Sequence, residues 1–202
     1  LSPEVKISLH AGALTSALPG VKKQDLRFHI RSAVTVAGAS RIGHGVDVLG
    51  EDDAPGLMAE MARRRTMVEI NLTSNDTILD VVGARHPFES YRRAGVPLAL
   101  STDDEGVSRI DLTHEFVRAT KTYGLGYTDL KTLVRNSLEY AFLPGASLWR
   151  QTVPFAMVEA CAGEQMPSPA CRDFLARSGK AAAQWRLETE FARFESSSWP
   201  KP

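Results

Sequence analysis

The stretch VPLALSTDDEG, residues 96–106, joins an apolar run to an acidic turn. Residues 96–100 are apolar, short and without a helical period, which is typical of a buried strand. Asp103 and Asp104 follow at the end of that strand. Two carboxylates this close repel each other, so a metal ion, a basic partner or a hydrogen-bonding substrate is expected to stabilise them. The alternative is a solvated turn in which an Asp caps the next helix.

Three other segments also end in polar residues. Residues 5–9 alternate apolar and polar side chains and predict a strand with His10 at its C-terminal tip. In RIGHGVD, residues 41–47, two glycines flank His44 and allow a sharp turn and close approach of a ligand. Residues 67–72 predict another strand, followed by the polar tip TSN, residues 73–75.

The spacing of these tips favours a barrel. His10, His44, Asn71 and Asp103 are 34, 27 and 32 residues apart, and a (β/α)8 barrel of about 250 residues uses roughly 31 residues per unit. Amphipathic patterns predict the intervening and following helices at 26–37, 55–65, 86–94, 112–123 and 128–143. We therefore expect an α/β fold of the (β/α)8 TIM-barrel type, of which this chain holds about the last four units.

Two regions are expected. Residues 1–145 would be the C-terminal half of the barrel, and residues 146–202 an irregular connection and a C-terminal helical extension packed on it. The helix is expected over 170–195, with Gly179 as its weak point. Half a barrel would expose sheet edges, so we expect the missing N-terminal half to come from an upstream part of the protein or from another chain. A homo-oligomer is a separate expectation. The start at Leu1 in place of Met fits a piece of a longer polypeptide.

The composition argues against several partners. The 202 residues include 24 Lys plus Arg and 24 Asp plus Glu, so no net field attracts nucleic acid or an anionic membrane. No apolar run reaches the ~20 residues of a membrane span. Cys161 and Cys171 lack metal-binding spacing. A disulfide between them would indicate a periplasmic or secreted protein and free thiols a cytoplasmic one; a bridge is slightly favoured.

The polar tips can support metal chemistry. His10 and Asp103 offer an imidazole and a carboxylate, both suitable ligands for Zn2+. His44 and Asp104 add a titratable base and an acceptor. A zinc ion lowers the pKa of its water towards ~7, and a neighbouring histidine can orient or deprotonate that water. His29, His86 and His114 are interpreted as surface or packing residues.

The motifs SLHAG (8–12), RIGHG (41–45) and STDD (101–104) resemble, in order and spacing, three signatures of the adenosine deaminase family within the amidohydrolase superfamily. The resemblance implies zinc-dependent hydrolytic deamination at C6 of adenosine. It implies that His10 and Asp103 are zinc ligands and that His44 is the catalytic histidine. Asp104 would accept from N7 of the purine and Gly12 would contact the substrate.

Two departures from the family pattern limit this expectation. The HAG motif normally continues with a glutamate that protonates N1, and here that position is Ala13; losing a general acid costs about 10²- to 10⁴-fold in rate. The HxH pair of the family's first strand, which supplies two more zinc ligands, has no counterpart. We therefore expect an impaired part of a purine deaminase acting on adenosine, deoxyadenosine, adenine or AMP. The alternative is an inactive deaminase-like protein that binds purines or a partner.

Overall fold

The computed structural model describes residues 5–163 and 166–197. Residues 1–4, including the start at Leu1, therefore lie outside the described part, as do residues 164–165 and 198–202. The chain divides into two compact units, Leu1–Tyr140 and Ala141–Pro202. That division falls slightly before the predicted boundary after residue 145. None of the described helices is both long and apolar enough to cross a membrane.

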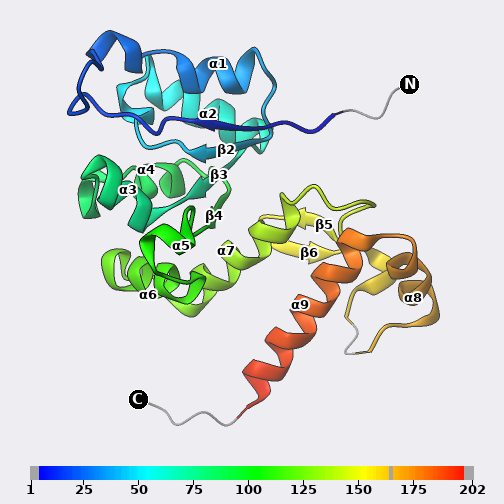
Figure 1. The fold of residues 1–202 in the computed structure, drawn as a ribbon. Helices are drawn as coiled ribbons and strands as arrows, with labels where there is room; N and C mark the ends of the chain where they lie inside the picture. The colour runs from blue at the N-terminus through cyan, green and yellow to red at the C-terminus, as the bar shows by residue number, and fades with distance from the viewer. Residues whose placement is uncertain (1–4, 164–165, 198–202) are drawn as a thin grey trace. The chain divides into compact units, whose positions relative to one another are not determined.

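The first unit is built on a four-stranded parallel sheet in the order β1-β2-β3-β4 (Figure 1). Its strands are β1 (Ser8–Ala11), β2 (Arg41–His44), β3 (Met67–Ile70) and β4 (Leu98–Leu100). Its helices are α1 (His29–Thr35), α2 (Ala54–Arg64), α3 (Leu72–Leu79), α4 (Phe88–Arg93), α5 (Glu105–Ser108), α6 (Leu112–Tyr123) and α7 (Tyr127–Glu139). Short 3-10 turns lie at Lys23–Leu26, Val48–Gly50 and Gly83–Arg85. The repeated strand–helix order is that of consecutive barrel units.

The main core lies between this sheet and its helices. Alternate strand residues such as Ile42, Val68 and Ile70 are wholly buried against side chains of α1, α2 and α4. The other face carries Arg41 and Glu69, whose side chains form an ion pair at 2.5 Å. Because strand side chains alternate between faces, the apolar set covers the helix side and the polar set faces the opposite side, which is the interior in a closed barrel.

The second unit is small and tied by a disulfide. It contains the antiparallel hairpin β5 (Trp149–Thr152) and β6 (Phe155–Met157), a 3-10 turn at Glu159–Cys161, and helices α8 (Pro169–Ala176) and α9 (Gly179–Ser196). Cys161 and Cys171 are wholly buried and bonded to each other. They pack with Leu148, Trp149 and Ala181 in a core of their own.

Several local predictions were wrong. The strand predicted at 5–9 is β1, which begins only at Ser8 and ends at Ala11, so His10 lies within the strand. The TSN segment, 73–75, is no strand tip but the first turn of α3. The irregular connection predicted at 150–170 contains the β5–β6 hairpin. The single helix predicted at 170–195 is two helices, because Ser178 caps a new helix at Gly179 by accepting the N–H of Ala181 at 3.0 Å.

Candidate functional site

The C-terminal ends of β1 and β2 place two histidines together. In the parallel register His10 lies opposite Gly43, and Ala11 lies opposite His44. The ring centroids of His10 and His44 are 4.3 Å apart. Nε2 of His44 is 3.8 Å from Oδ2 of Asp103, which follows β4. Three of the residues predicted from separate motifs therefore meet at one edge of the sheet.

The backbone at this edge is strained at two of the predicted residues. His44 has φ 71° and Asp103 has φ 56°, both in the left-handed region. Such conformations cost non-glycine residues of order 1–3 kcal/mol and persist only where the surroundings enforce them. At Gly45, the carbonyl accepts a hydrogen bond from the buried hydroxyl of Tyr91 at 2.7 Å. This contact fixes the turn that follows His44.

His44 is buried and held by amide side chains. Its Nδ1 is 3.0 Å from Nδ2 of Asn75 and 3.3 Å from Nδ2 of Asn71. Burial lowers the pKa of His44 below its usual value, and His10 lowers it further, whereas the carboxylates of Asp103, Glu69 and Asp104 act in the opposite direction. The environment therefore favours the neutral ring.

His86 belongs to the same network, although the sequence indicated only a surface or packing role. Its Nε2 is 3.1 Å from Oδ1 of Asn75, and its Nδ1 accepts the backbone N–H of Phe88 at 3.1 Å. Burial lowers the pKa of His86 to about 4. No sequence motif links it to His44, because the connection runs through Asn75, eleven residues away along the chain.

Asp103 also has a partner on α3. The hydroxyl of Ser74 donates to Oδ2 of Asp103 at 2.6 Å. Ser74 and Asn75 were predicted as strand-tip residues, and as helix residues they contact the candidate site from a different element. The first turn of α3 thus supplies one polar contact to Asp103 and one to His44.

The other predicted residues are placed as follows. Gly12 has φ +80°, and a Cβ built on it would lie 2.7 Å from Cα of Gly45, so the two turns pack backbone to backbone. Ala13 is half-buried beside it and carries no proton donor. Asp104 is exposed at the start of α5, where its side chain makes no capping hydrogen bond. Its charge acts on His44, where it raises the pKa of the ring slightly against the effect of burial.

The donor set for a metal is incomplete among the residues that the structure describes. Within residues 5–163 and 166–197, no group of three or more His, Cys, Asp or Glu side chains is arranged to hold a metal ion. His10 and Asp103 are of the right chemical types for zinc, and both are exposed. A catalytic zinc needs three protein ligands.

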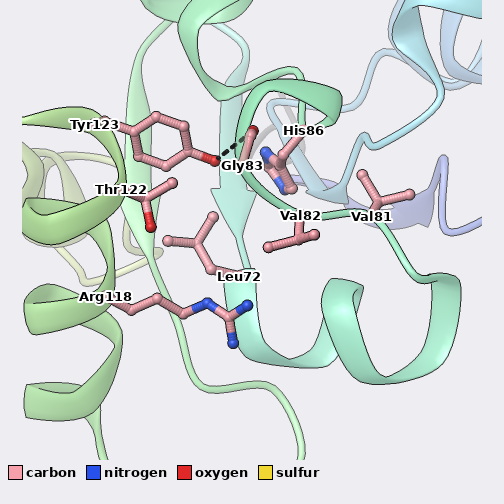
Figure 2. Close-up of a pocket in the computed structure, with 8 residues that line it drawn as sticks. All are labelled: Leu72, Val81, Val82, Gly83, His86, Arg118, Thr122 and Tyr123. Carbon is pink, nitrogen blue, oxygen red and sulfur yellow. Dashed lines mark hydrogen bonds between the residues drawn. The ribbon is translucent and has the colours of Figure 1, made fainter.

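A pocket lies beside the network (Figure 2). His86, Leu72, Arg118 and Tyr123 are among its lining residues, and the Tyr123 hydroxyl donates to the Gly83 carbonyl at 3.3 Å. None of the six predicted site residues lines it. The pocket therefore gives no support to a substrate site there.

Comparison with known proteins assigns the chain to a family. The family model described as "Adenosine deaminase" matches residues 2–148. The chain belongs to the adenosine deaminase family. Adenosine deaminase of Shewanella loihica is 38% identical over 112 residues, 55% of this chain and 33% of the relative. Adenosine deaminase of Enterococcus faecalis is 34% identical over 140 residues, 69% of this chain and 37% of the relative. The chain thus spans about a third of the length of these relatives.

Solved structures related to this adenosine deaminase family member have the same fold. An adenine deaminase from Arthrobacter aurescens matches 94% of this chain and 44% of its own length, with a TM-score of 0.60 and 17% sequence identity. A zinc-bound amidohydrolase from Burkholderia ambifaria matches 93% of this chain and 43% of its own length, with a TM-score of 0.54 and 18% identity. The N6-methyl-AMP deaminase of Arabidopsis thaliana matches 69% of this chain and 37% of its own length, with a TM-score of 0.54 and 26% identity. The predicted fold class, a partial (β/α) barrel, is confirmed.

Proposed function

We propose that this chain is the C-terminal part of a zinc-dependent hydrolase that deaminates adenosine or a related purine, releasing ammonia. The observation that carries the proposal is the meeting of His10, His44 and Asp103 at the ends of three separate strands. Each residue comes from a motif of the adenosine deaminase family, and the family assignment supports the same activity.

His10 and Asp103 would hold the zinc ion as two of its ligands. Their imidazole and carboxylate fit the metal, but the set is short of the three ligands of a catalytic site. We propose that the missing barrel units, from an upstream segment or a second chain, supply the others. Bound zinc provides Lewis acidity that makes water a nucleophile at neutral pH.

The remaining steps depend on residues of this chain. His44 lies beside Asp103 and would orient the attacking water. Asp104, exposed on the following turn, would accept from N7 of the purine, and Gly12 would let the ring approach the backbone. Ala13 cannot donate a proton to N1, so the proposed reaction runs without its usual general acid, at a cost of about 10²- to 10⁴-fold in rate.

Ala13 also supports a second candidate: a deaminase-like protein that binds purines, or a partner, without turnover. A protein that has lost its general acid keeps a shaped site but not the proton transfer. The two candidates differ in what happens when the acid is restored.

The test is an absorbance assay of adenosine deamination on the zinc-loaded protein, for the chain alone and combined with its N-terminal barrel half. We expect no turnover by the chain alone, slow turnover by the combination, and a gain of about 10²- to 10⁴-fold in Ala13→Glu. Ala13→Gln, which has similar size but no acid, is the matched control. Micromolar purine binding without turnover in Ala13→Glu would favour the second candidate. Normal turnover by the chain alone, with one zinc per chain, would refute the requirement for a second half.

A further inference from the structure

A chain of hydrogen bonds runs from the backbone at Phe88 to the candidate catalytic histidine. It passes through His86 and Asn75 and ends at Nδ1 of His44. The residues His86, Asn75 and His44 are 3%, 1% and 5% exposed, respectively. Water therefore has little access to replace any of these bonds, and each polar atom depends on its protein neighbour.

The backbone fixes the direction of the first bond. An amide N–H can only donate, so Nδ1 of His86 accepts from Phe88 at 3.1 Å. A neutral imidazole carries one proton, which must then be on Nε2 of His86. Burial holds the pKa of His86 at about 4, so the ring is neutral at neutral pH.

The direction of the next bonds follows. Nε2–H of His86 donates to Oδ1 of Asn75 at 3.1 Å, and this turns the amide nitrogen of Asn75 toward Nδ1 of His44 at 3.0 Å. The opposite direction would require both nitrogens of His86 to accept, which a neutral ring cannot do. Nδ1 of His44 is therefore an acceptor.

We propose that His86, acting through Asn75, is a positioning residue that holds the neutral ring of His44 in the tautomer with its proton on Nε2. Nε2 is the nitrogen that lies 3.8 Å from Asp103. In this tautomer His44 presents a hydrogen-bond donor toward Asp103 and cannot take a proton from water through Nε2. Its part in the reaction, which rests on the proposed function, is then to orient the water oxygen by donation.

The direct test is nitrogen-15 NMR of the histidine rings at neutral pH, which distinguishes a protonated from an unprotonated ring nitrogen. We expect Nε2 of His44 to carry the proton in the wild type and in His86→Gln. The glutamine can accept from Phe88 and donate to Asn75, as His86 does. In His86→Leu the signals of His44 should show a mixture of both tautomers. His114 is an exposed residue of α6, so the control variant His114→Gln should leave the signals of His44 unchanged.

The sharpest variant is Asn75→Asp. A carboxylate can only accept, so it should draw the proton of His44 to Nδ1 and leave Nε2 unprotonated. Asn71 can then rotate its side-chain amide so that its Oδ1, in place of Nδ2, faces the protonated Nδ1 of His44. No hydrogen bond is lost, because Oδ1 has no hydrogen-bond partner among the described residues. A proton on Nδ1 of His44 in the wild type, or an unchanged tautomer in Asn75→Asp, would overturn the proposal.

The role in the reaction has a separate readout. In the complete zinc-loaded enzyme, Asn75→Asp and His86→Leu should lower kcat by about 10- to 100-fold, as is typical for residues that orient a catalytic group. KM should change little, and His86→Gln should restore most of kcat. Absence of activity in the wild type would refute the proposed function. The tautomer of His44 that NMR finds in the wild type would still test the proposed direction of the hydrogen bonds. Normal kcat in Asn75→Asp with an inverted tautomer would refute the positioning role alone.

Discussion

The carboxylate of Glu115, wholly buried on α6, accepts the backbone N–H of Leu72 at 2.8 Å. It also accepts the N–H of Thr73, so one side chain satisfies two free donors at the start of α3. Asn71 precedes the helix without capping it through its own side chain. Because α3 carries Ser74 and Asn75, Glu115 stabilises the element that contacts Asp103 and His44.

We expect Glu115→Ala to lower the free energy of unfolding by about 2–4 kcal/mol, since it leaves two buried donors unpaired. Urea denaturation measures the change, and Thr113→Ala, an exposed position on the same helix, is the control. Glu115→Gln should cost less, because one acceptor oxygen remains. A loss under 1 kcal/mol in Glu115→Ala would contradict the capping role.

Gly12 is expected to tolerate no side chain. A Cβ there would lie 2.7 Å from both Gly45 Cα and Ile30 Cδ1, and the backbone φ of +80° already disfavours other residues. Gly20 has nearly the same φ, +83°, with nothing within 4 Å of its Cβ position. Gly20→Ala should therefore cost about 1–2 kcal/mol from the backbone alone.

Gly12→Ala should cost at least about 2 kcal/mol more than Gly20→Ala, because the neighbouring turn must move. Thermal or urea unfolding of the two variants side by side isolates the steric part. Equal losses would mean that the β1 and β2 turns are not in close contact.

His86 should make stability depend on pH. Its pKa is about 4 in the folded protein and near 6.5 when unfolded, so the unfolded chain binds more protons between these values. Its contribution is complete above about pH 6.5 and is lost as the pH falls towards 4, by about 3 kcal/mol. Asp47 acts in the opposite direction over much of this range, since burial raises its pKa to about 6.

The difference in unfolding free energy between wild type and His86→Gln isolates the histidine, because Asp47 is present in both. We expect that difference to shift by about 3 kcal/mol in favour of the wild type from pH 4 to pH 7. Urea titrations at several pH values provide it. A difference independent of pH would show that His86 titrates in the folded state as it does in the unfolded chain.

The sequence was sufficient to predict the sheet and its polar edge, because strand periodicity and strand-end motifs are local. His10, His44 and Asp103 could be grouped before any coordinates, since parallel strands place their C-terminal ends at one edge. The start of α3 could not be predicted in this way. Two of its N-terminal donors are satisfied by Glu115, more than forty residues away along the chain, and no local sequence pattern predicts such a cap.

The hydrogen bonds of His86 could not be predicted from the sequence either. A histidine before a proline gives no sign of its hydrogen-bond partners, and its side-chain partner Asn75 lies in the first turn of α3, which was itself predicted as a strand tip. Once Asn75 is on α3, the network with His44 follows from the fold. With residues 73–75 predicted as a strand tip, nothing in the sequence brought Asn75 beside His86.

The disulfide between Cys161 and Cys171 is expected to stabilise the second unit. It closes a loop of ten residues, for which the chain-entropy model gives about 2–3 kcal/mol. All three tryptophans, including Trp149 and Trp185 of that unit's core, lie after residue 140. The fluorescence of Trp149 and Trp185 therefore reports the unfolding of this unit.

We expect the double variant Cys161→Ala, Cys171→Ala to unfold, by fluorescence, with about 2–3 kcal/mol less stability than the oxidised protein. Adding reductant should destabilise the wild type by a similar amount and leave the double variant unchanged, which makes that variant its own control. Thiol labelling of protein blocked at the moment of cell lysis tests the pairing directly. Unlabelled cysteines would support a periplasmic or secreted protein, and full labelling would mean that the bridge is open in the cell.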